Sequence, residues 1–377
     1  MRREMAWFGL LMLLFFMQDV FAQNKVDFSQ LLYAYLGYYP KYETVYEVGL
    51  GYIPKLSAEV PIDSLHGFKM EASLTLGATA KFRGFEEING NAGISPYRLW
   101  IRYATPQAEA RIGLQSIEFG SAQFLRPLQW FDQKDPNDPL RMSRGVYALL
   151  GRYYFPNNAN VWGWGLYGNK QLGLQYVVPV SPKHLGLGGR FQLPIPKGEA
   201  AISFNRSTLH QEVVMQNKPI VHENRFGFDA KADLKIGVWV EMSFSTLSEA
   251  LNKVRYRRLL TFGVDYTVGL GNGLSLQTEH LISSFGDTRL EWGNLDVLSV
   301  LSLQYPLTLS DMIGIMVYRQ WKSEKSFVVA QYRHDFRKWT VFAVGFLGAS
   351  QQANLPESEI EATMFTPGIR FLLMYHR

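Results

Sequence analysis

The chain alternates apolar and polar residues over many short segments. Between Lys69 and Phe82, every second residue from Met70 onward is apolar, and the residues between them are polar, charged or glycine. Successive side chains of a strand point to opposite faces, so this segment predicts a β-strand with one apolar and one polar face. The same alternation recurs in residues 185–193, 225–234, 259–268 and 365–375.

Alternation alone also describes a soluble antiparallel sandwich. Two features favour a transmembrane β-barrel instead. Charges lie well inside several polar faces, as with Arg225, Asp229 and Lys231. The segments also reach about ten residues, which a tilted strand needs to cross a bilayer, whereas sandwich strands are shorter on average. The pattern therefore predicts an all-β, antiparallel, up-and-down barrel in an outer membrane.

The number of predicted strands is about eighteen. They lie near residues 27–38, 47–60, 68–82, 95–105, 107–117, 145–155, 160–168, 185–194, 198–207, 222–233, 236–246, 257–269, 273–284, 296–307, 311–321, 326–336, 338–348 and 364–375. Sixteen strands is the alternative, because Val146–Tyr154 and Trp339–Phe346 alternate only weakly. An even number closes the barrel with both termini on the periplasmic side.

The predicted connections fall into two classes. Even-numbered strands mostly end in tight turns, such as Thr105-Pro106 and Gly271-Asn272-Gly273. Odd-numbered strands mostly end in longer, more polar segments, such as Arg83 to Ile94 and Thr208 to Val221. Short turns at one end and long loops at the other are typical of outer-membrane barrels, with the long loops extracellular.

The first residues predict export. A basic start at Arg2 and Arg3 precedes the apolar run from Ala6 to Met17, and Val20-Phe21-Ala22 fits a cleavage site. The alternative is a transmembrane helix, but the run is too short to cross a bilayer comfortably. We therefore predict a signal peptide over residues 1–22 and a barrel over residues 23–377.

Composition narrows the chemistry. The chain has no cysteine, so disulfides, cysteine-based zinc sites and cysteine catalysis are excluded. The net charge of +5 comes without a concentrated basic stripe and does not indicate nucleic-acid binding. Aromatic residues make up 14% of the chain, which suits the aromatic girdles of a membrane barrel. The expected partners are outer-membrane lipid, lipopolysaccharide, a small polar solute and, as a possibility left open, further copies of the chain.

The longest connection runs from Ser116 to Arg144 and follows the fifth predicted strand. It contains FLRPLQWFDQKDPNDPLR, residues 124–141, where Pro136 and Pro139 each follow an aspartate. The residue before a proline is pushed out of the helical region, so this segment predicts an irregular loop. Its apolar residues are too numerous for a loop in water. We expect it to fold into the lumen, with Trp130 and Phe131 packed on the barrel wall.

This architecture resembles that of general diffusion porins, which fold the loop after their fifth strand into the barrel and narrow the pore with its acidic residues. The segment L-R-P-L-Q-W-F-D-x-x-D-P-x-D-P-L is similar to one found in uncharacterised porin-like outer-membrane proteins. The resemblance covers barrel topology and the placement of this loop. It implies passive or substrate-selective passage of small polar solutes. The alternative function is a plugged barrel that serves as a scaffold or partner of a surface or secretion complex.

Charges on the neighbouring strands suggest a constriction. An arginine facing lipid at mid-membrane depth would cost about 2–4 kcal/mol, so Arg98, Arg102 and Arg111 are predicted to point inward. Asp132, Asp135 and Asp138 of the loop would then face them across the lumen and set up a transverse field. The plainer alternative is that the inward charges solvate a water-filled wall and the aspartates cap turns. The lipid-facing set on these strands is predicted to be Tyr97, Leu99, Ile101, Tyr103, Ala108, Ala110, Ile112 and Leu114.

Other chemistries find little support in the sequence. The spacing of the three loop aspartates lacks the alternate-residue acids and central glycine of a calcium loop. His280 and Ser283 have opposite parity on one strand, so they do not form a catalytic pair. We therefore predict no catalytic residues, no metal site, no cofactor and no enzymatic activity.

Overall fold

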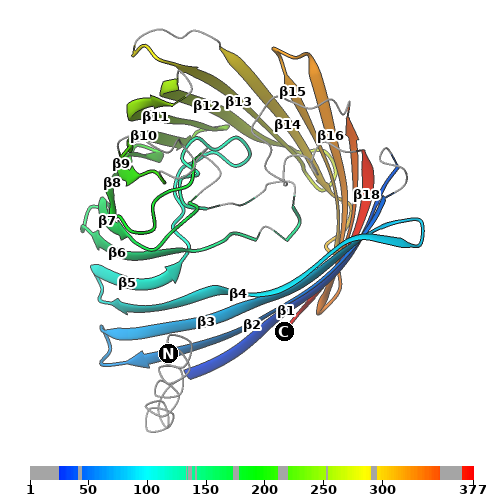
Figure 1. The fold of residues 1–377 in the computed structure, drawn as a ribbon, viewed down its shortest axis with the longest axis horizontal. Coiled ribbons are helices and arrows are strands. Elements are labelled where there is room, and N and C mark those ends of the chain that lie inside the picture. Colours follow the sequence, from blue (N-terminus) through cyan, green and yellow to red (C-terminus); the bar gives the residue numbers. More distant parts are fainter. Residues whose placement is uncertain are drawn as a thin grey trace.

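The computed structural model describes residues 25–40, 45–132, 134, 138–140, 142–172, 178–210, 220–251, 254–289, 295–348 and 367–377. The described residues form an eighteen-stranded antiparallel sheet that closes into a barrel (Figure 1). Each strand pairs with its neighbours in sequence, and β1 (Lys25–Tyr39) pairs with β18 (Gly368–His376) to close the ring. The predicted eighteen-stranded, up-and-down barrel is confirmed. The predicted signal peptide lies outside the described residues.

The strand bounds agree closely with the alternation in the sequence. The strands between the two closing ones are β2 (Val45–Pro61), β3 (Gly67–Arg83), β4 (Glu86–Ala104), β5 (Ala108–Gln115), β6 (Val146–Tyr154), β7 (Asn160–Leu166), β8 (Gly186–Ile195), β9 (Gly198–Thr208), β10 (His222–Asp233), β11 (Gly237–Leu251), β12 (Val254–Val268), β13 (Leu274–Gly286), β14 (Asp296–Pro306), β15 (Asp311–Gln320), β16 (Lys325–Asp335) and β17 (Trp339–Gly348). The weakly alternating segments β6 and β17 are both complete strands, so the alternative count of sixteen is wrong.

Burial alternates along the strands as the two-face pattern requires. On β11, Glu241 is 0% exposed, whereas the next residue, Met242, is 40% exposed. The outward positions carry large apolar side chains that would face lipid, while the inward positions carry most of the buried charged and polar groups. This arrangement is expected of a barrel whose outer surface meets hydrocarbon. No helix among the described residues is long and apolar enough to cross a membrane.

The connection after β3 differs from the prediction. Residues 83–94 were expected to form a long polar loop, but β3 and β4 continue through most of this segment and pair as far as Arg83 and Glu86. Gly84 has a φ of 62°, which allows a tight turn where an ordinary side chain would be strained. Both faces of the first half of β4 are exposed. The hairpin therefore extends past the rim of the barrel, as the light-blue strands in Figure 1 show.

One residue of the predicted lipid-facing set is not exposed to lipid. Leu99, Ile101 and Ile112 are exposed as expected, but Leu114 is only 5% exposed. Leu114 pairs with Leu99 and Tyr147, and it follows Gly113, whose φ of 124° breaks the regular strand geometry. The strand is therefore distorted near its end, where the chain leaves the wall.

The closing register can be tested with a disulfide, because the chain has no cysteine of its own. Leu36 lies opposite Phe371 across the β1–β18 pair, and both face outward. Directly opposed residues have Cα atoms about 4.5–5.5 Å apart, within the range that a disulfide bridges. Leu36→Cys with Phe371→Cys should therefore cross-link on mild oxidation, as measured by mass spectrometry of the proteolysed protein.

The matched control pairs Leu36→Cys with Leu373→Cys, which lies on the same face but two residues out of register. Such diagonal neighbours are about 7–8 Å apart and should cross-link poorly. Equal cross-linking of the two pairs would contradict this register.

Candidate functional site

The described part of the chain between β5 and β6 lies inside the barrel. It comprises residues 116–132, 134, 138–140 and 142–145 and is called here the inner loop. Figure 1 shows it leaving the wall after β5 and crossing the interior of the ring of strands. Its backbone is hydrogen-bonded to side chains of β11, β12 and β13, which are more than 100 residues away in sequence. The predicted inward-folding loop after the fifth strand is confirmed.

Two buried carboxylates hold the first half of the inner loop. Glu279 on β13 accepts hydrogen bonds from the backbone N–H groups of Gln123, Phe124 and Leu125 at 2.7, 3.0 and 2.6 Å. Glu241 on β11 accepts from those of Ala122 and Leu128 at 2.9 and 2.5 Å. Both glutamates are 0% exposed. The loop backbone thus solvates charges that would otherwise be costly to bury.

Further contacts on the same wall fix the path of the loop. Thr261 on β12 donates a hydrogen bond from its hydroxyl to the carbonyl of Leu125 at 2.6 Å. Gly120 has a φ of 99°, and a Cβ added there would collide with the Glu241 carboxylate. Only glycine combines that backbone conformation with so close an approach. Because these contacts come from adjacent strands, the loop lies along β11–β13.

Aromatic side chains of the inner loop pack on β7, and Trp130 also meets Gly227 of β10 and Ser243 of β11. The Phe119 ring stacks on Trp164 with centroids 5.6 Å apart, and Phe131 meets the same indole edge-on at 5.4 Å. Trp130 and Phe131 are 0% and 1% exposed, and the Trp130 indole donates to Ser243 Oγ at 3.1 Å. The remaining buried members of this cluster are Ile117, Leu128, Val146, Ala148, Leu150, Leu166, Leu172, Val180, Leu209 and Val221.

The charges predicted to form a transverse field have different surroundings. Arg98 is 9% exposed and donates from Nη2 to the Ser143 carbonyl at 2.9 Å, so it holds the end of the inner loop. Asp132 is 1% exposed, and its carboxylate pairs with Arg126 at 2.9 Å within the loop. These two side chains are engaged in fixing the loop, and Asp132 does not line an open passage.

Of the other four predicted residues, three are partly accessible. Arg102 pairs with Glu109 at 3.3 Å and keeps 32% of its side chain exposed. The Arg111 guanidinium lies 4.6 Å from the centroid of the Trp100 ring. Asp138 belongs to the loop, and its burial raises the pKa of the carboxyl, against the lowering effects of the Leu140 amide and Arg370. Asp135 lies outside the described residues.

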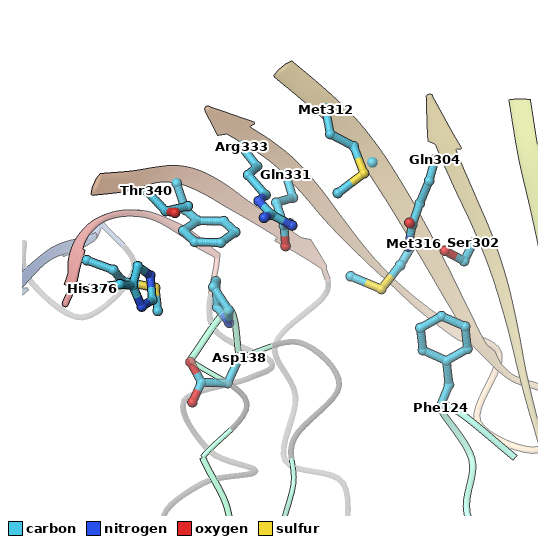
Figure 2. A pocket seen from close by; sticks show the side chains of 14 residues that line it. Phe124, Asp138, Ser302, Gln304, Met312, Met316, Gln331, Arg333, Thr340 and His376 are labelled. Atoms are coloured by element: carbon cyan, nitrogen blue, oxygen red, sulfur yellow. The ribbon is translucent and has the colours of Figure 1, made fainter. Parts of the chain in front are cut away.

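Two cavities separate the inner loop from the opposite wall, and Asp138 borders both. One, of about 280 Å³, lies between the loop and β14–β18; Figure 2 shows Phe124 and Asp138 on its loop side. The other, of about 260 Å³, lies beside Tyr33, Arg370 and Leu372. Leu372 and Met374 are successive inward residues of β18 and line one cavity each. The two cavities therefore follow one another along β18, with Asp138 between them.

The residues that anchor the loop were not identified from the sequence. Glu241 and Glu279 fall on the polar faces of predicted strands, so their inward direction could have been read from the alternation. Nothing in the sequence indicates that their partners are backbone N–H groups 113–156 residues earlier. Among the described residues, no group of three or more histidine, aspartate or glutamate side chains is arranged to hold a metal ion.

Comparison with known proteins identifies the fold. No protein-family model matches the chain, and no curated protein matches its sequence. The structure is similar to Pseudomonas aeruginosa OccK9 (OpdG), with a TM-score of 0.60 and 9% identity, over 95% of this chain and 98% of that one. It is also similar to P. aeruginosa OccK7 (OpdD), with a TM-score of 0.58 and 9% identity, over 95% of this chain and 99% of that one.

A third similar structure is Salmonella typhi OmpF, solved in complex with daunomycin. Its TM-score is 0.55 at 9% identity, over 94% of this chain and 98% of that one. These neighbours are Gram-negative outer-membrane porins. At such low identity, the likeness establishes a porin-type barrel fold for this chain.

The anchoring of the loop gives a testable prediction. Hydrogen bonds to charged groups contribute about 1.5–3 kcal/mol each, so replacing Glu241 and Glu279 with alanine should release the loop. In the folded, detergent-solubilised barrel, a protease that cuts before large apolar residues should then cleave at Leu128 or Phe131. The native loop should resist, as followed by mass spectrometry.

The control for this experiment is Glu59→Ala. Glu59 is a 52%-exposed carboxylate on β2 that pairs with Lys69. Its removal should leave the loop protected. Continued protection of the double variant would show that the aromatic cluster alone holds the loop.

Proposed function

We propose that this protein is a porin-like channel through which small solutes cross the outer membrane. The observation that carries the proposal is the asymmetric position of the inner loop. Its backbone is fastened to β11–β13, while cavities remain on the side of β14–β18 and β1. A loop fixed in this way narrows a barrel without filling it. Binding groups that line what remains can then select the solute.

The charges nearest this path define its narrow part. Asp138 borders both cavities, so it supplies negative charge from the loop. Arg102 and Arg111 supply positive charge from the wall, and Arg370 lines one of the cavities. In this proposal Arg98 and Asp132 keep the loop in position, which differs from the pore-lining role expected from the sequence.

The proposal includes an orientation. The tight turns, such as 269–273 between β12 and β13, face the periplasm together with both termini, and the β3–β4 hairpin faces outside. A protease site inserted beside Asn272 should resist cleavage on intact cells, while one beside Gly84 should be cut. The opposite cleavage pattern would show that the barrel has the reverse orientation in the membrane.

Conductance separates a channel from a plugged scaffold. Purified protein in planar bilayers should give discrete current steps. Replacing residues 122–131 with a glycine-serine linker should enlarge them, because the loop occupies part of the lumen. Folded barrels that insert without current steps, both with and without the native loop, would support the scaffold function.

Ion selectivity tests whether Asp138 borders the conducting path. In a salt gradient, Asp138→Asn should shift the reversal potential toward anions, because Arg370 and the wall arginines remain. The raised pKa means that the native carboxyl becomes neutral at a higher pH than an ordinary aspartate. The difference between variant and native protein should therefore shrink as the pH falls toward and below about 4.

Asp63→Asn is the matched control, since it removes the same charge from the exposed β2–β3 turn. It should leave the reversal potential unchanged. If both variants behave alike, Asp138 does not border the conducting path.

A further inference from the structure

Many inward side chains of β14–β18 are apolar, which is unusual for a water-filled barrel. Inward residues of a porin-type channel are mostly polar. Here the inward positions of five adjacent strands form a buried apolar cluster, called the apolar wall. Its members on these strands are Val300, Met316, Tyr318, Phe327, Val329, Phe342, Val344, Phe346, Leu372 and Met374.

The rest of the lumen has a different character. The inward positions of β10–β13 include Arg225, Asp229, Glu241 and Glu279, all at most 1% exposed. That side needs polar groups because it holds the backbone of the inner loop. Among the described residues of the loop, those that pack with the apolar wall are Phe124, Leu125 and Leu140, which are all apolar.

The cavity of about 280 Å³ lies directly against the apolar wall. Met312, Met316 and Met374 line it together with Phe342, and Phe124 closes it from the loop. Methionine side chains adapt to the shape of a ligand, and a thioether gains about 0.3–1.5 kcal/mol from contact with an aromatic ring. A flat aromatic body therefore fits this lining better than a hydrated polyol does.

Polar groups also line the same cavity, on either side of the methionines. Figure 2 shows Arg333 and Gln331 beside each other on β16, and Gln304 and Ser302 on β14, with Met312 and Met316 of β15 between the two pairs. The Arg333 guanidinium is paired with Asp335 at 2.7 Å, so its charge is already compensated. These groups offer hydrogen-bond donors and acceptors, and Asp138 on the loop side disfavours an anionic solute, so the lining suits a neutral polar substituent.

We propose that this cavity is a binding site for small single-ring aromatic solutes that carry a neutral hydrogen-bonding group, such as aryl amides or phenols. The volume is just below the range of about 300–1,000 Å³ that is usual for drug-sized ligands, which favours one ring. The role of this site as a selective step in solute passage rests on the proposed channel function. Binding itself can be measured without conductance.

The test uses benzamide and erythritol, two solutes of similar mass, with the folded barrel in detergent. Saturation-transfer NMR should detect binding of benzamide and not of erythritol. Met316→Gln with Met374→Gln makes the wall polar at nearly constant size and should weaken benzamide binding about tenfold. Ser302→Val makes the lining more apolar and should strengthen it.

The two variants should change benzamide binding in opposite directions. Partition of benzamide into detergent would not respond to either variant, so the pair distinguishes binding at the site from partition. Equal signals for the native protein and both variants, or equal signals for benzamide and erythritol, would overturn the site. In planar bilayers, benzamide should also interrupt the current of the native channel more than that of the double methionine variant. A barrel that binds benzamide but does not conduct would contradict the proposed function and leave the site standing.

Discussion

The interior of this barrel depends on two carboxylates that hold a polypeptide backbone. Glu241 and Glu279 accept five N–H groups of the inner loop, and the loop in turn solvates two charges buried at 0% exposure. Neither partner is stable alone in that place, because an unpaired buried carboxylate and unpaired buried N–H groups are both costly. The position of the loop, and with it the free space in the lumen, follows from this mutual need.

That attachment divides the lumen into two unlike halves. The side that carries the loop is rich in charges and hydrogen-bonding groups, as with Arg190 and Asp229, which pair at 2.5 Å. The other side has few backbone groups to satisfy, and its inward positions can be apolar. The division explains how one barrel combines a firmly held constriction with a surface that can contact apolar parts of a solute.

Strand periodicity predicted the barrel and its strand number, and the apolar content of the loop predicted that it folds inward. Periodicity succeeded because each strand has one face toward lipid and one toward the lumen, a constraint that acts on every second residue. Sequence-based prediction failed where the alternation of residues does not determine the structure. The polar composition of residues 83–94 predicts a loop, but these residues continue a hairpin. The position of Asp132 predicts a pore-lining residue, but it is buried and pairs with Arg126. Contacts such as Glu279 with Phe124 join residues 155 apart, and no local pattern encodes them.

The long sequence separation between the inner loop and its anchors has a consequence for assembly. The loop is complete by residue 145, but Glu241 and Glu279 belong to strands that form much later in the chain. Until β10 and β11 are in place, Trp130 lacks its contacts with Gly227 and Ser243, and the loop aromatics are exposed to unwanted association. Closure of the interior is therefore a late event in assembly. An incompletely assembled barrel differs from the finished one in that these aromatic rings are still exposed.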